Sequence, residues 1–184
     1  LKFIGVSSLP NVYLERSLKN IRSKLLFSLL QNPKQQDFLE FQSALALHCF
    51  TNEYIYPETK KEINDLESLN SLVKKIFLSG EQPSPQLILC LASYRSLMEY
   101  TWCEDLIISS SIEEVFTRQV VEPRQEFSLK SGISILRSIT DKVSIKVKAQ
   151  YEKNPYPRWV SLGLSLRPLL ISEITKQLDL VFFD

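Results

Sequence analysis

Apolar residues recur every three or four positions along most of this 184-residue chain, which is the spacing of one face of an α-helix. The first such run is expected to begin at Pro10 and to end near Asn32, because Pro33 disfavours helix in the residue before it. The face of this helix that we expect to be buried consists of Leu14, Leu18, Ile21 and Leu25.

A second helix is predicted over residues 34–52, and "YIYPET" at 54–59 then breaks the helical spacing. The side chains of the second helix expected to face inward are Phe38, Phe41, Leu45 and either His48 or Cys49. A third helix follows and is expected to end at Ser79-Gly80, since glycine commonly terminates helices. Its expected buried positions are Ile63, Leu66, Leu69, Val73 and Ile76.

Proline and aspartate mark the ends of the remaining predicted helices. Pro85 is placed to open a fourth helix, with Leu87, Leu91, Tyr94 and Met98 as its apolar positions. A fifth helix is predicted over residues 111–121 and is expected to stop at Pro123. Asp141 is predicted to be the N-cap of a helix carrying Val143, Val147 and Tyr151. Pro168 is expected to open a last helix through Leu170, Ile174 and Leu178.

These patterns predict an all-α fold, an irregular bundle of about six or seven helices with an extended C-terminal arm. We expect two parts along the chain: a helical domain over residues 1–149, and the turn "NPYPRW" with the C-terminal arm over residues 150–184. The apolar ending "LDLVFFD" gives the sequence the appearance of having been cut short, and an exposed apolar tail of this kind favours self-association.

Composition narrows the functional classes. The net charge is +1, which favours neither nucleic-acid nor membrane partners, and no apolar run approaches the roughly 20 residues that span a bilayer. The chain lacks the charged segment followed by an apolar segment that characterises a signal peptide, so no signal peptide is expected. Three widely spaced cysteines, Cys49, Cys90 and Cys103, indicate a reduced, cytoplasmic protein with buried thiols.

Catalytic and metal-binding patterns are not found in the sequence. The single histidine, His48, lies on an apolar helical face beside Cys49, and neighbouring residues on a helix diverge by about 100°, so they do not form a Cys–His dyad. The four glycines are too far apart for a phosphate-binding loop. The acidic pairs Glu104-Asp105 and Glu113-Glu114 are expected to be solvated carboxylates at helix starts. We therefore expect no catalytic residue and no metal site in this chain.

The stretch "QYEKNPYPRW", residues 150–159, is the least regular part of the chain. In one interpretation it is a helix stop whose prolines fix an extended exit. In the other it is a rigid binding loop that presents aromatic faces and a planar cation. The candidate binding residues are Tyr151, Asn154, Tyr156, Arg158 and Trp159.

Four segments resemble one family. "VSIKVKAQYEKNPYPRW" (143–159) is similar to a segment that precedes the catalytic domain in bacterial S-adenosylmethionine-dependent methyltransferases associated with tetratricopeptide repeats. "SALALHCFTNEYIY" (43–56), "LASYRSL" (91–97) and "VVEPRQE" (120–126) resemble segments of that family in the same order. His48 stands where the family pattern has glutamine. In that family the cofactor-binding half follows, beginning with a strand and a glycine-rich loop.

The resemblance implies that this chain is a non-catalytic helical module, with S-adenosylmethionine bound by a catalytic half outside it. Residues 150–159 would then form a strap over the mouth of the cofactor pocket. The module would link the tetratricopeptide repeats to the catalytic half or regulate that half, and would help to recognise a protein substrate. The alternative is a stand-alone helical domain that binds another protein or associates with itself. A third possibility, an unrecognised enzyme, would require a buried polar cleft around His48, Glu53 and Tyr54.

Overall fold

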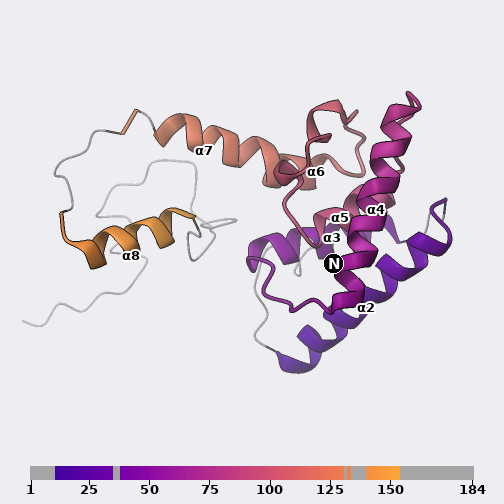
Figure 1. Ribbon diagram of the computed structural model, residues 1–184, viewed down its shortest axis with the longest axis horizontal. Helices are drawn as coiled ribbons and strands as arrows, with labels where there is room; N and C mark the ends of the chain where they lie inside the picture. Colours follow the sequence, from indigo (N-terminus) through magenta and orange to yellow (C-terminus); the bar gives the residue numbers. More distant parts are fainter. Residues whose placement is uncertain (1–10, 35–37, 131, 134–139, 154–184) are drawn as a thin grey trace, which may run out of the picture.

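The computed structural model describes residues 11–34, 38–130, 132–133 and 140–153. Within these ranges every regular element is helical, which confirms the predicted all-α fold. Helices α2 to α6 form an irregular bundle, and α7 leads away from it towards α8, which lies at the other end of the longest dimension (Figure 1).

Helix α2 (Val12–Gln31) begins at an N-cap. The side chain of Asn11 accepts two backbone N–H groups of the first turn, at 3.0 and 3.1 Å, which would otherwise lack acceptors. The helix ends before Pro33, as predicted. Its buried positions are Leu18, Arg22, Leu26 and Leu29. Ile21 was expected to be buried but is 37% exposed, because the helix turns the ridge that contains Arg22 towards the bundle.

Helix α3 (Leu39–Thr51) is almost completely enclosed, and every side chain from Ala44 to Phe50 is buried. Phe38, which was expected to face inward, is 70% exposed. The reason is that Phe38 precedes the helix in a left-handed conformation, with φ 63°, so its side chain does not follow the helical face.

Helix α4 (Lys60–Leu78) starts with a capping box, in which Thr59 and Glu62 each accept the other's backbone N–H. It ends next to Gly80, whose φ of 78° is unstrained only for glycine, as the sequence predicted. Its buried positions are Glu62, Leu66, Leu69 and Val73. The prediction for Ile63 is wrong, since this side chain is 42% exposed.

Helix α5 (Pro85–Ala92) lies at the centre of the bundle. It packs against α2, α3 and α4, and every residue from Gln86 to Ala92 is buried. The predicted extension to Met98 is wrong, because the chain leaves the helix after Ala92 and forms two short 3₁₀ turns at Leu97–Glu99 and Cys103–Asp105.

The predicted stop at Pro123 is also wrong. Helix α6 (Glu113–Phe116) continues through a π-helix (Thr117–Val121) into α7 (Glu122–Lys130). Pro123 has no N–H to offer the carbonyl four residues earlier, that of Gln119. The hydroxyl of Ser96 donates to this carbonyl at 3.1 Å, so the proline is tolerated inside the helical run.

Helix α8 (Lys142–Lys153) begins as predicted, with the Asp141 carboxylate accepting the backbone N–H of Ser144 at 2.8 Å. Every side chain from Lys142 to Glu152 is exposed. The expected boundary between residues 149 and 150 falls within this helix, and the division into two parts stays a prediction. The predicted helix after Pro168 lies outside the described residues.

Candidate functional site

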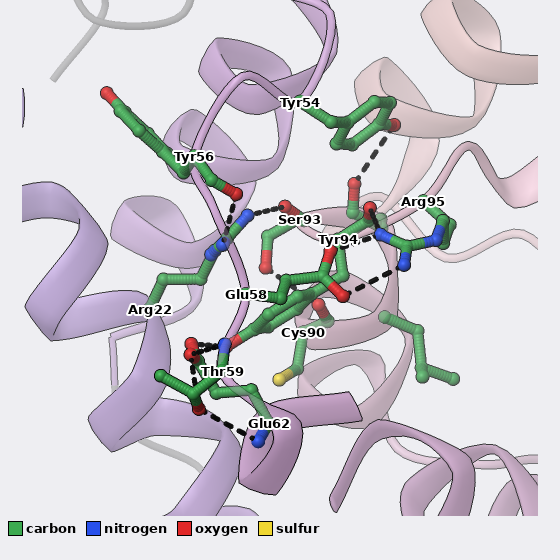
Figure 2. A network of polar contacts seen from close by, with 12 residues as sticks. Arg22, Tyr54, Tyr56, Glu58, Thr59, Glu62, Cys90, Ser93, Tyr94 and Arg95 are labelled. Carbon is green, nitrogen blue, oxygen red and sulfur yellow. Dashed lines mark hydrogen bonds and ion pairs between the residues drawn. The ribbon is translucent and has the colours of Figure 1, made fainter. Parts of the chain in front are cut away.

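The most polar part of the bundle interior is centred on Arg22 of α2, whose side chain is fully buried. Its guanidinium donates to the backbone carbonyl of Tyr56 at 3.2 Å and to that of Ser93 at 3.4 Å (Figure 2). Both carbonyls belong to segments that are not helical at those positions, so they have no helical partner. Arg22 therefore ties α2 to the loop before α4 and to the end of α5.

Two tyrosine rings also contact the Arg22 cation. The guanidinium carbon lies 4.1 Å from the ring centre of Tyr94 and 5.6 Å from that of Tyr56. A cation over an aromatic face is attracted by the negative face of the ring, and the attraction is stronger away from water. These rings replace part of the hydration that the buried charge has lost.

The countercharge is Glu62 of α4, which Tyr94 connects to Arg22. The Tyr94 hydroxyl donates to Glu62 Oε1 at 3.1 Å, and the backbone N–H and hydroxyl of Thr59 each donate to Glu62 Oε2 at 2.9 Å. Burial opposes ionisation of Glu62, but these hydrogen bonds and the Arg22 charge outweigh it, so the pKa of Glu62 lies below its usual value.

The loop over residues 54–59, which we call the 54–59 strap, crosses the network in Figure 2. At one end the Tyr54 hydroxyl donates to the carbonyl of Ala92 at 3.3 Å. Near the other end Glu58 forms a bidentate ion pair with Arg95. The strap is thus fixed to the C-terminal end of α5 and the residues after it.

His48 belongs to the same region and is a buried core histidine. Its Nε2 lies 2.8 Å from the Tyr56 hydroxyl and 3.2 Å from Nδ2 of Asn52, and the residue is 2% exposed. The imidazole is therefore enclosed by its own hydrogen-bond partners. Two cavities described by the structure lie instead along α4.

The thiols and phenols of the network are held in their neutral forms. Burial raises the pKa of Cys49 to about 11 and that of Cys90 to about 12, although the Arg22 charge acts in the opposite direction. Burial likewise raises the pKa of Tyr56 to about 12 and places that of Tyr94 higher still. At neutral pH the network holds a fixed cation and a fixed anion among neutral groups, an arrangement suited to positioning helices.

A second polar junction is formed by Gln119, which lies on the π-helix and is fully buried. Its Nε2 donates to the carbonyls of Ala46 at 3.4 Å and Ala92 at 3.0 Å, and its Oε1 accepts the N–H of Leu97 at 3.0 Å. One side chain thereby connects backbone groups of α3, of the end of α5 and of the turn that follows it.

Among the binding residues predicted from the sequence, Tyr151 lies on α8 and is 60% exposed. In Figure 1, α8 is far from the helices that carry the Arg22 network, so Tyr151 and Arg22 belong to different parts of the molecule. Asn154, Tyr156, Arg158 and Trp159 lie outside the described residues.

The sequence interpretation missed Arg22, Glu62, Tyr94 and Gln119 as a group of interacting polar residues. A signal for Arg22 was present, because it stands four residues after Leu18 and four before Leu26 on an apolar ridge. Glu62 follows Thr59 by three residues, which is the spacing of a capping box. Gln119 offered no comparable signal, since its partners come from distant parts of the chain.

In the part of the chain that the structure describes, His, Cys, Asp and Glu form no group of three or more able to hold a metal ion. The described helices also include none with both the length and the apolar character needed to cross a membrane. Comparisons with protein families, with curated proteins and with solved structures found no match to this chain. The resemblance to methyltransferases stays a prediction.

Proposed function

We propose that this chain is a non-catalytic helical module of a bacterial, cytoplasmic methyltransferase-type protein, which supports the catalytic half and helps to recognise a protein substrate. The observation that carries the proposal is the convergence of the three upstream segments resembling that family. Residues 43–56 form most of α3 and the start of the 54–59 strap, 91–97 form the end of α5 and the chain after it, and 120–126 run from the end of the π-helix into α7.

The first two segments contact each other directly, and the residue next to the third segment contacts both of them. Tyr54 of the first segment donates to Ala92 of the second. Gln119, the residue immediately before the third segment, contacts Ala46 of the first and both Ala92 and Leu97 of the second. Segments that all derive from one ancestral domain are expected to pack together. The packing seen here therefore supports the resemblance as a whole.

In this proposal the fourth segment contacts the catalytic half. Tyr151 presents an exposed ring on α8, and Asn154, Tyr156, Arg158 and Trp159 follow it along the chain. The aromatic residues would cover the cofactor pocket, and Arg158 would pair with an anion or a carbonyl. S-adenosylmethionine would be held by the catalytic half.

A second candidate is a stand-alone protein-interaction domain. It is favoured by the exposed apolar side chains of α7 and α8, among which Phe127 is 79% and Val143 68% exposed. Exposed apolar side chains such as these can supply the apolar part of a contact surface.

Calorimetric titration of S-adenosylmethionine and S-adenosylhomocysteine tests the proposal, both with this chain and with the whole protein that its gene encodes. We expect no heat from this chain at millimolar ligand and one-to-one binding by the longer protein. A reading frame that stops after Asp184 would favour the stand-alone domain. One-to-one binding by the 184-residue chain, abolished in Trp159→Ala, would overturn the non-catalytic assignment.

A further inference from the structure

Helix α8 carries an apolar stripe edged by positive charge. Val143 and Val147 are 68% and 44% exposed, and residues four apart lie on one side of a helix. Lys142 and Lys146 precede them by one residue each, which places the two lysines about 100° around the helix and along one edge of the stripe. The stripe thus combines an apolar centre with a cationic border.

A cleft of about 540 Å³ at the C-terminal end of α4 has the complementary character. Phe77, Leu78 and Trp102 contribute its apolar lining, and Leu78 is 87% exposed. The charged residues that line it are Glu81, Asp105 and Lys74, so carboxylates outnumber ammonium groups.

This cleft is preformed. The Gln82 side chain donates to the backbone carbonyl of Asp105 and accepts the backbone N–H of Ile107, both at 3.0 Å. The Trp102 ring stacks on Phe77 and on Tyr100, whose ring centres lie 5.8 and 4.8 Å from its own. Its walls therefore need no rearrangement to receive a partner, which reduces the entropic cost of binding.

The cleft and the stripe do not meet within one chain. Figure 1 shows α8 and α4 at opposite ends of the longest dimension, with α7 between them. The stripe of one chain can reach the cleft of another, and the same contact can then form in the reverse direction about a two-fold axis. Specific interfaces bury roughly 800 Å² per partner, and a reciprocal pair needs only about half of that from each contact.

We propose that two copies of this chain form a reciprocal dimer, in which the Val143–Val147 stripe of each α8 occupies the α4 cleft of the other, with Lys142 and Lys146 facing Glu81 and Asp105. The occupant is a second copy because the valines and the lysines of the stripe complement the apolar lining and the carboxylates of the cleft. The inference does not depend on the methyltransferase proposal, since both surfaces belong to the described residues of this chain.

Sedimentation velocity of the purified 184-residue chain tests the dimer. We expect the wild type to dimerise, and the dissociation constant to rise at least about tenfold in Val147→Asp. The matched control is Ile145→Asp, which places the same charge about 160° around the same helix at a position that is 48% exposed. This variant should dimerise like the wild type.

Charge reversal gives the sharper test. Lys142→Glu/Lys146→Glu and Glu81→Lys/Asp105→Lys should each be monomeric alone, because like charges then face each other in both contacts. Mixed in equal amounts, the two variants should form a dimer, since each restores opposite charges in both contacts. All four positions are exposed, and circular dichroism of each variant confirms that it is folded.

A monomeric wild type would overturn the proposal, as would a dimer that survives both charge reversals. Failure of the mixed variants to dimerise would also overturn it. The outcome is separable from the proposed function, because cofactor binding by the longer protein is measured independently of the oligomeric state.

Discussion

The guanidinium of Arg22 lies over the ring of Tyr94, 4.1 Å from its centre, and the hydroxyl of the same tyrosine donates to Glu62. A buried cation and a buried carboxylate are thus connected through one neutral aromatic side chain. Arg22 lies on α2 and Glu62 on α4, while Tyr94 follows the end of α5. Their contacts therefore fix the positions of these three central helices relative to one another.

Arg22→Ala is expected to lower the free energy of unfolding by about 3 kcal/mol or more, because it leaves two buried carbonyls without donors and opens a cavity. Arg22→Met, which restores much of the volume, should lose less. Urea unfolding followed by circular dichroism measures both. Arg16→Ala, at an exposed position of the same helix, should change the stability by at most about 0.5 kcal/mol. A similar small effect for Arg22→Ala would show that the network adds little stability.

Glu62 should make the bundle sensitive to acid. Its pKa is lower in the folded state than the ordinary value of 4.5, so its stabilising contribution is fully present above that value and is lost as the pH falls below it towards the folded pKa. Glu62→Gln should reduce stability at pH 7 and flatten its decline between about pH 5 and pH 3. Urea midpoints measured across this pH range test this, with Glu67→Gln at an exposed position of α4 as the control. If the midpoint of Glu62→Gln fell with pH as steeply as those of the wild type and the control, Glu62 would not be the source of the acid sensitivity.

Gln119→Met is expected to destabilise the chain by about 1–3 kcal/mol, since the buried N–H of Leu97 loses its acceptor and two backbone carbonyls each lose one of their donors. Gln125→Met provides the comparison at an exposed site of α7, where the effect should be small. Equal urea midpoints for the two variants would contradict the role assigned to Gln119.

Ser96 and Pro123 should be energetically coupled. Ser96→Ala removes the donor to the Gln119 carbonyl and should cost about 1 kcal/mol in the wild type. In a Pro123→Ala background the new backbone N–H can donate to that carbonyl, so the cost of Ser96→Ala should fall. A double-mutant cycle measures this coupling, and strictly additive effects would rule out a shared acceptor.

The three cysteines should be unreactive in the folded protein. Each is at most 3% exposed, and burial raises all three thiol pKa values, so the thiolate that reacts is scarce at neutral pH. Ellman's reagent should label none of them quickly in buffer and all of them in concentrated urea. Rapid labelling of one thiol in buffer would show local opening at that position.

The elements that could be predicted from the sequence were those determined by local chemistry. Pro33, Gly80 and Asp141 mark helix ends because their own side chains or backbone preferences act within a few residues. Ile21 and Phe38 were placed wrongly, since their exposure depends on how a helix is turned against its neighbours and on a left-handed residue at its start.

Long-range partners explain the remaining differences. A proline inside a helix normally ends it, and Pro123 does not because Ser96, 27 residues earlier in the sequence, supplies the missing donor to Gln119. The Arg22 network likewise combines residues from three helices and the 54–59 strap. No pattern of spacing within one segment contains that information.

The π-helix at Thr117–Val121 also bears on the length of the chain. A π-turn holds one residue more than a turn of regular α-helix, so losing one residue from this segment would return it to regular spacing while α7 continues in nearly the same direction. Losing one residue from α7 itself has no wide turn to absorb it and would rotate everything beyond it by about 100°. The five-residue segment is therefore where the length of the chain can change while α7 keeps its orientation.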